Sequence, residues 1–529
     1  MFDQGLATTT THDQRELERR IEEIYTDLLH DQEAAAAAIN LRRDAHATFC
    51  GNAIAKPLRA GFIALDASRT WIAYWNIHSL ALLGRPLPPP PKSAGPERVA
   101  QGPTATREAL ISFLASCQSP RGGFGGGPGQ LPHLATTYAA IAALVELGGD
   151  DALAVPDRGA LWEMLLRHCV PPEEGGGMRV TEGGEVDIRG SYTAVASAYM
   201  VGLDVAELDR RAGIVDYVRR CQTHEGGLGG EPGNEAHGGY TYCGVACLKL
   251  LGRLDAIDTS AAARWASVQC QGSTEGGFRG RTDKLVDSCY AFWQAAALPI
   301  LRDAGVGGCA AVNAAASGTG GAAEAWRAVA DEVQSADLAP RSLKEQAVGL
   351  SEAAAAQEVE TVQSNTAEVR TTDDEAIAAF LRAGQAQKAA ELALDDVATA
   401  SSAAPAVFRE ILGTQPASGA PQDAPATPER ALFDALCLQG WVLACGQPDS
   451  GGGLRDKPGK SVDHYHTCYA LSGLSVAQHC ARAGLQGEAA DAVLLGGPGN
   501  LLRATDPATN VVTDNLRAAL RYYGERGGV

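Results

Sequence analysis

The chain has 529 residues, 45% of them hydrophobic, enough to bury a large core and, by length alone, to form two to four domains. Lys and Arg total 44 against 63 Asp and Glu, and the net charge of −19 argues against a general nucleic-acid-binding surface. No apolar run reaches the roughly 18 residues of a membrane span, and no secretory signal is evident at the start. Thirteen scattered cysteines, an odd number, indicate reduced thiols in an intracellular protein.

Helical patterns begin near the N-terminus. The apolar, aromatic-rich segment after Ser68 predicts a buried helix with Ser68 as its N-cap, and the proline-rich run 86–96 predicts a connector. Before it, residues 14–49 are predicted to be helical from four apolar residues at helical spacing: Leu17, Ile21, Ile24 and Leu28.

From residue 105 onward a repeat is visible. In each unit a cysteine precedes a glycine-rich segment, which is followed by an apolar helix with aromatic residues. Five cysteines mark the units, at intervals of 52, 52, 49 and 175 residues: Cys117, Cys169, Cys221, Cys270 and Cys445. A period near 50 with two helical segments per unit predicts a closed or solenoid array of helix pairs, whereas unrelated glycine loops would rarely recur in register.

The last interval is too long for one unit and indicates an insertion at 303–428, rich in Ala, Gly, Ser, Glu and Gln. We expect a partly disordered excursion there. The predicted organisation is a helical extension (1–59), the first part of the repeat array (60–302), the low-complexity insertion (303–428), and the last part with a final helix near 513–523 (429–529).

Two stretches carry the residues of a possible metal site. KLVDSCYAFW follows the glycine-rich EGGFRGR and holds Asp287 and Cys289, and DHYHTCY holds His466 at the equivalent place of a later unit. Carboxylate, thiolate and imidazole are ligands that zinc accepts, and three protein ligands leave the open position of a catalytic site. The alternative is a surface Asp, a core Cys and an unrelated His.

Basic and hydroxyl side chains in the same turns suit the binding of a phosphate or diphosphate. The alternative is that they are ordinary solvated surface charges, which have the same sequence pattern. They are His237, Tyr240, Arg281, Lys284 and Tyr290. Aromatic residues recur on the inner-helix side of the units, as a core or as the lining of a deep apolar pocket. They are Trp71, Tyr74, Trp75, Tyr138, Tyr192, Tyr242, Trp293 and Tyr469.

With these motifs, the chain resembles the β-subunits of protein farnesyltransferases. SPRGGFGGGPGQLPHLATTYAA, GGLGGEPGNEAHGGYTYCG, GGFRGRTDKLVDSCYAFWQA and GGGLRDKPGKSVDHYHTCYALSGLS carry the similarity, over about 60–302 and 429–523. The resemblance implies an all-α fold, an α/α toroid with a central funnel, bound to a separate α-subunit in a cytoplasmic heterodimer.

The resemblance also implies roles for individual residues. Asp287, Cys289 and His466 match zinc ligands, and Asp456 matches a carboxylate linked to Mg²⁺ assistance. Tyr469 lies near Trp71 in the expected pocket. The residues that match those holding the diphosphate are His237, Arg281, Lys284 and Tyr290. Those that match the lining of the isoprenoid cavity are Arg189, Tyr192, Cys243 and Trp293. Those that match the residues flanking the peptide are Trp71, Trp75 and Tyr465.

The implied reaction is transfer of farnesyl from farnesyl diphosphate to a cysteine in a C-terminal CaaX motif of proteins such as small GTPases. Zinc coordination would deprotonate the acceptor thiol, whose ordinary pKa is about 8.5. The sister enzyme, geranylgeranyltransferase type I, is the alternative; bulky Trp71 and the acid Asp456 favour farnesyl. A terpene cyclase is disfavoured because the chain lacks a D-x-D-D motif, and a non-catalytic helical scaffold would leave the metal and diphosphate residues without a role.

Overall fold

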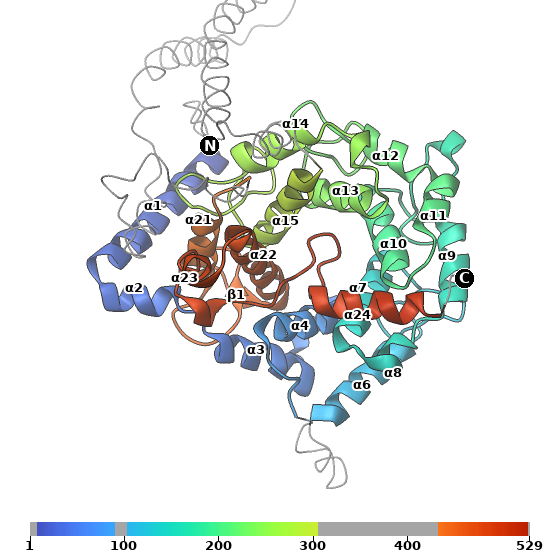
Figure 1. Cartoon of the computed structure of the whole chain (residues 1–529), viewed down its shortest axis with the longest axis horizontal. Helices are drawn as coiled ribbons and strands as arrows, with labels where there is room; N and C mark the ends of the chain where they lie inside the picture. The colour runs from blue at the N-terminus through green and yellow to red at the C-terminus, as the bar shows by residue number, and fades with distance from the viewer. Residues whose placement is uncertain (1–7, 90–102, 305–431, 527–529) are drawn as a thin grey trace, which may run out of the picture.

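The computed structural model describes residues 8–89, 103–304 and 432–526, and these are nearly all helical (Figure 1). The names α and β follow the labels of Figure 1, and η marks 3-10 or π-helical segments. The elements in order are α1 (Thr9–His30), α2 (Gln32–Ile39), α3 (Arg43–Ala55), η1 (Ala60–Ser68), α4 (Arg69–Leu83), α6 (Pro103–Ser116), α7 (Leu134–Leu147), α8 (Gly149–Leu153), α9 (Arg158–His168), η2 (Pro172–Glu174), α10 (Ile188–Met200), α11 (Val205–Ala212), α12 (Ile214–Arg220), α13 (Gly238–Leu250), η3 (Leu254–Ala256), α14 (Thr259–Arg264), η4 (Trp265–Gln269), α15 (Tyr290–Asp303), α21 (Ala435–Gly440), η5 (Trp441–Gly446), β1 (Leu454–Arg455), β2 (Val462–Asp463), α22 (His464–Arg482), α23 (Gly487–Asp491), η6 (Pro498–Asn500) and α24 (Thr513–Gly524).

Six apolar helices form a closed inner ring. Helices α4, α7, α10, α13, α15 and α22 pack in this order, and α22 packs back against α4 (Figure 1). An outer layer covers them, with α3 on α4, α6 on α7, α12 on α13, α14 on α15 and α21 on α22. The inner helices are buried nearly all round, as α7 is from Leu134 to Glu146, which explains their continuous apolar sequence. The closed alternative of the predicted helix-pair array, an α/α toroid, is therefore confirmed.

The glycine-rich segments are the turns that lead from an outer to an inner helix. Two of the repeat cysteines fix the start of these turns in the same way: Gly125 N donates to the carbonyl of Cys117 and Gly229 N to that of Cys221, both at 2.9 Å. Glycine is needed because, for example, Gly226 has φ +107° and a Cβ there would lie 2.3 Å from a backbone oxygen of α14. All the inner helices therefore begin at the same end of the ring.

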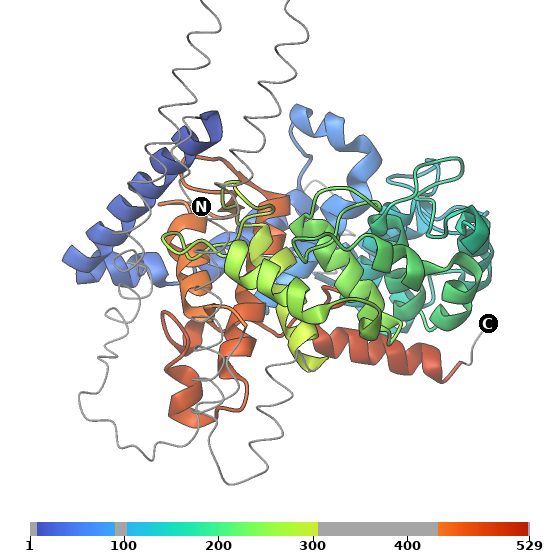
Figure 2. The ribbon, with the colours of Figure 1, turned by 90° about the horizontal axis from the view of Figure 1, so that it is seen from above.

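The first and last described helices pack against the ring from outside. The predicted N-terminal stripe is on α1, where Leu17, Ile21 and Leu28 are buried. Ser68 directly precedes α4 as predicted, but its side chain makes no capping hydrogen bond. The final helix is α24, which lies across one end of the ring on α7, α8 and α10 (Figure 2).

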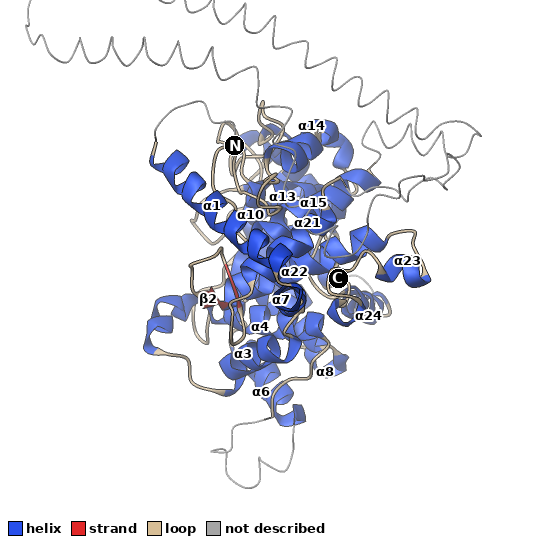
Figure 3. Cartoon of the chain, turned by 90° about the vertical axis from the view of Figure 1, so that its left-hand side faces the viewer, coloured by secondary structure: helices blue, strands red, loops and turns tan. Residues whose placement is uncertain are grey.

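Other elements add little to the ring. Strands β1 and β2 form a two-stranded antiparallel pair that leads directly into α22 (Figure 3). The insertion beyond residue 304 and most of the proline-rich connector lie outside the described residues. Among the helices of the described part, none is long and apolar enough to cross a membrane.

Candidate metal centre and aromatic belt

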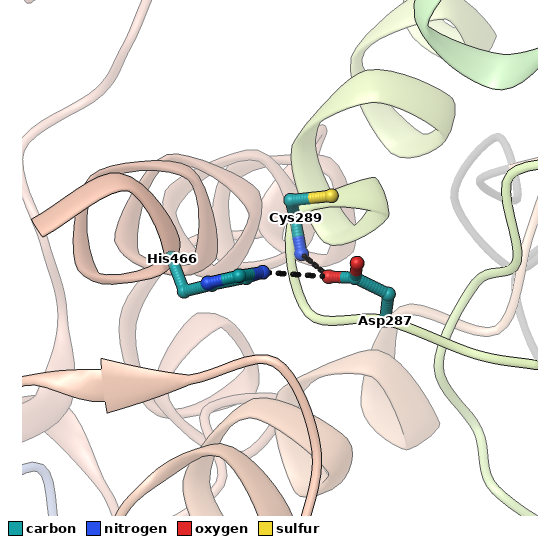
Figure 4. A group of neighbouring side chains, drawn as sticks. All are labelled: Asp287, Cys289 and His466. Carbon is teal, nitrogen blue, oxygen red and sulfur yellow. Dashed lines mark hydrogen bonds and ion pairs between the residues drawn. The ribbon is translucent and has the colours of Figure 1, made fainter. Parts of the chain in front are cut away.

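Asp287, Cys289 and His466 meet where α15 and α22 begin (Figure 4). One carboxylate oxygen, the Sγ atom and one imidazole nitrogen all lie within 4.8 Å of one another. Cys289 is the N-cap of α15, and His466 is in the first turn of α22, which packs along α15. The packing of α22 against α15 thus brings together residues on opposite sides of the insertion.

The donor set fits a divalent cation such as zinc. Burial, and then the neighbouring Asp287, raise the pKa of Cys289, so its thiolate is favourable only beside a positive charge. His466 Nε2 lies 3.3 Å from Asp287 Oδ1. Burial would lower the pKa of His466, but its hydrogen bonds to Asp287 and Asp463 outweigh burial and raise it to about 10, which marks a site that attracts positive charge.

Asp463 supports the candidate metal site, although the sequence motifs did not assign a role to it. Its Oδ2 accepts a hydrogen bond from His466 Nδ1 at 2.6 Å, which leaves Nε2 to face Asp287 and Cys289. Its other oxygen caps α22 by accepting from the backbone N–H of His466. A carboxylate that holds the second nitrogen of a metal-ligating histidine is common, and the Asp three residues before the histidine was its sequence signal.

A polar cluster lies at the same end of the ring as the metal ligands. His237 caps α13 through Nδ1, which accepts from Gly239 N, so Nε2 carries the proton and donates to the Tyr290 hydroxyl at 3.1 Å. Burial and nearby Arg281 lower the pKa of His237 and keep the imidazole neutral. Tyr290 directly follows Cys289, so this cluster is continuous with the metal centre.

Three cationic side chains surround that cluster. Arg281 pairs with Glu235 at 2.9 Å, and Lys284 is exposed on the same turn. The guanidinium of Arg189 lies 5.7 Å from the centre of the Tyr240 ring, which in turn packs on His237. Inner-helix N-termini point the same way, so helix dipoles and side chains favour an anion here.

Asp456 lies beside the metal ligands as the resemblance implies. Its backbone oxygen accepts from Ser288 N and Oγ, both at 2.8 Å, and its carboxylate bonds to Lys457. Burial, and then the nearby Asp287, raise its pKa, although Lys457 opposes them. A further cation beside this carboxylate would relieve the repulsion.

We call the end of the ring that carries the metal ligands and the polar cluster the rim. Below the rim, eight aromatic rings form a closed belt. Every neighbouring pair in it has ring centroids 4.3–5.9 Å apart, and each inner helix contributes. In order around the ring they are Trp71, Tyr138, Tyr192, Tyr242, Trp293, Tyr469, Tyr465 and Trp75. Cys243, on α13 next to Tyr242, is buried, and burial raises the pKa of its thiol. The sequence shows Tyr138 and Tyr242 only as recurring aromatic residues, because their place in the belt depends on how the inner helices pack.

Comparisons with known proteins agree with this geometry. The family model described as "Prenyltransferase alpha-alpha toroid domain" matches residues 41–511. The protein farnesyltransferase subunit beta of Pisum sativum is 35% identical, over 86% of this chain and 89% of the relative. The geranylgeranyl transferase type-1 subunit beta of Arabidopsis thaliana is 37% identical over 32% of this chain and 46% of the relative.

The solved structure of Candida albicans protein geranylgeranyltransferase-I, complexed with GGPP, shares the fold. Its TM-score is 0.54 at 14% identity, covering 92% of this chain and 99% of that chain. Fold and site thus define a prenyltransferase α/α toroid. The chain belongs to the protein prenyltransferase β-subunit family, in which the relatives that it matches over most of its length are farnesyltransferase β-subunits.

Proposed function

We propose that the chain is the catalytic β-subunit of a heterodimeric, zinc-dependent protein farnesyltransferase. It would transfer farnesyl from farnesyl diphosphate to the thiol of a C-terminal CaaX cysteine, in proteins such as small GTPases of the cytoplasm. The observation that carries the proposal is the metal-ligand triad at the rim, directly above an aromatic belt. An α-subunit is the expected partner, because the relatives are β-subunits.

Asp287, Cys289 and His466 would hold the zinc ion, with Asp463 fixing the His466 ring. When bound, zinc supplies the positive charge that keeps a coordinated thiol deprotonated at neutral pH. Asp456 would hold Mg²⁺ near the departing diphosphate. The first-turn position of His466 and the capping position of Cys289 keep these ligands on rigid helices.

The residues of the rim would bind the diphosphate. The Tyr290 hydroxyl accepts a hydrogen bond from His237, which leaves its own proton free to donate to a diphosphate oxygen. Arg281 and Lys284 supply positive charge where negative charge accumulates as the C1–O bond breaks. Arg189 lies over Tyr240 on the same side. These groups sit beside the metal ligands, so the thiol and the allylic carbon would be held together.

The belt would enclose the isoprenoid chain and exclude water from it. Trp71, Trp75 and Tyr465 form one side of the belt, where the peptide would lie, and Tyr465 directly precedes the metal candidate His466. A bulky Trp71 facing Tyr138 suits a farnesyl chain better than a longer one. Geranylgeranyl transfer, the type I activity, is the alternative.

The direct test is an assay of the heterodimer, co-purified with its α-subunit, on CaaX peptides with farnesyl and geranylgeranyl diphosphate. We expect a farnesyl thioether on the peptide cysteine and none on a Cys-to-Ser peptide. Transfer of neither chain would refute the proposal, and a preference for geranylgeranyl would support the alternative.

Metal analysis tests the zinc assignment. We expect about one zinc per heterodimer and, in Cys289→Ala, loss of zinc together with at least about 100-fold of the activity, since even outer-shell changes cost 10–100-fold. Cys247→Ala, a buried cysteine on α13, is the matched control and should keep both. A metal-free protein with full activity would contradict the assignment.

A further inference from the structure

The loop before α24 enters the ring and closes it below the aromatic belt (Figure 1). Three successive carbonyls of this loop accept hydroxyl groups from three successive inner helices. Tyr74 donates to Asn510 O at 2.5 Å, Tyr138 to Thr509 O at 2.7 Å and Tyr192 to Ala508 O at 3.1 Å. The floor loop, residues 505–512, is almost completely buried.

The floor loop has its own rigid turn. Asp506 Oδ1 accepts hydrogen bonds from the backbone N–H groups of Ala508 and Thr509 and from the Thr509 hydroxyl. Asn510 has φ +49°, a left-handed conformation that asparagine tolerates better than most residues. The turn thus presents its carbonyls to the tyrosines, two of which belong to the belt.

One buried carboxylate ties this loop to the ring from the other side. Glu146 Oε1 accepts from Val512 N at 2.7 Å, and Oε2 accepts from Asn515 Nδ2 at 2.6 Å. The same Oε1 lies 2.5 Å from His78 Nδ1, and both side chains are fully buried. Glu146 therefore holds the end of the floor loop and the start of α24 at once.

His78 is fixed on its other nitrogen as well. Ser472 Oγ lies 3.1 Å from His78 Nε2, and it also bonds to the carbonyl of Cys468 at 2.9 Å. The His78 ring also stacks on Tyr74, at 5.5 Å between centroids. This network joins α4, α7, α22 and the floor loop, and none of its members touches the metal ligands or the rim cluster.

We propose that Glu146 is a positioning residue for prenyl chain length: with His78 it holds residues 505–512 as the floor on which Tyr138 and Tyr192 are set. Glu146 lies eight residues beyond Tyr138 on α7, about 12 Å along the helix, so it acts through the loop and not on substrate. The inference rests on the proposed prenyl transfer. A rigid floor stops the chain at farnesyl length, and a loosened floor admits one more isoprene unit.

The test compares kcat/KM for farnesyl and geranylgeranyl diphosphate in the heterodimer. In Glu146→Leu we expect the farnesyl preference to fall at least tenfold, with kcat for farnesyl within threefold of the wild type; Glu146→Gln should show a smaller shift. Tyr523→Phe is the control, because it removes a 2.7 Å hydrogen bond from α24 to Leu153 O without touching the floor loop. The ratio of kcat/KM for the two diphosphates should not change in Tyr523→Phe.

Hydrogen exchange of peptides covering 505–512 gives a second readout. Exchange there should be at least tenfold faster in Glu146→Gln and Asn515→Ala than in Tyr523→Phe, and these variants are decisive if Glu146→Leu does not fold. A faster-exchanging loop with an unchanged diphosphate ratio would overturn the proposal, as would unchanged exchange in both variants. If the wild type transfers neither chain, the proposed function fails instead.

Discussion

Trp71 is the side chain that most directly links one residue to substrate choice. Its ring contacts Tyr74, Trp75 and Tyr138, on one wall of the belt. Replacing it with threonine removes this bulk, so we expect Trp71→Thr to shift preference toward geranylgeranyl diphosphate. The measurement is the ratio of kcat/KM for the two diphosphates, and an unchanged ratio would count against the pocket assignment.

His46 gives a prediction about pH. It is fully buried on α3, where Nδ1 accepts from Gly453 N at 3.0 Å and Nε2 donates to Gln447 Oε1 at 2.8 Å. Burial lowers its pKa to about 4, below the unfolded value near 6.5. The unfolded chain therefore takes up this proton first, and about 3 kcal/mol of stability, fully present above pH 6.5, is lost as pH falls toward 4.

Thermal melting at pH 7.0 to 4.5 measures this loss. The wild type should lose Tm more steeply than His46→Asn, which has no titrating ring at this position. Other buried histidines contribute equally to both proteins, so the difference between the two curves isolates His46. Parallel curves would show that this histidine does not couple stability to pH.

At the scale of elements, a close contact between α15 and α22 positions the metal ligands. A Cβ on Gly473 of α22 would lie 2.3 Å from the carbonyl carbon of Ala291 on α15. Ala291 is two residues after Cys289, and Gly473 is two turns after His466 on the same helix. The metal ligands can approach only because α22 has glycine at this crossing.

Gly473→Ala should therefore push α15 and α22 apart. We expect the free energy of unfolding to fall by about 1–3 kcal/mol, because overpacking a core costs about this much. We expect the zinc affinity to fall as well. Gly524→Ala, in α24 with open space around it, should change neither. Chelator competition measures the affinity, and wild-type zinc binding in Gly473→Ala would contradict the role of this crossing.

At the scale of the whole molecule, the ring closes across the insertion. Helices α15 and α21, which flank it in sequence, both pack against α22. Long insertions between packed elements cost little loop entropy, so the ring's stability should not depend on the inserted residues.

We expect a heterodimer in which a short Gly/Ser linker replaces 305–428 to farnesylate a CaaX peptide at a near-normal rate. Pull-down of the α-subunit is the control for assembly. Loss of turnover with the α-subunit still bound would show that the insertion takes part in the reaction.

The sequence alone determined the repeat, and its resemblance to a known family indicated the toroid, while the repeat pattern by itself left a closed ring and a solenoid open. The glycine turns recur in register, and Asp287, Cys289 and His466 occupy equivalent places in two units, so local patterns were sufficient to select them as metal candidates. Helix positions near 513–523 and after Ser68 followed from apolar periodicity and capping residues. These features depend on contacts within one unit or between adjacent units.

The tertiary structure alone decided how distant side chains combine. The eight aromatic rings close into a belt only when α22 meets α4, and the floor carbonyls of 508–510 meet tyrosines more than 300 residues earlier. The Glu146–His78 pair had no sequence signal, because the sequence pattern of a single carboxylate in an apolar helix is the same whether its side chain is exposed to solvent or buried and hydrogen-bonded. Pairings of this kind are set by how the inner helices and the floor loop pack together, which no local pattern encodes.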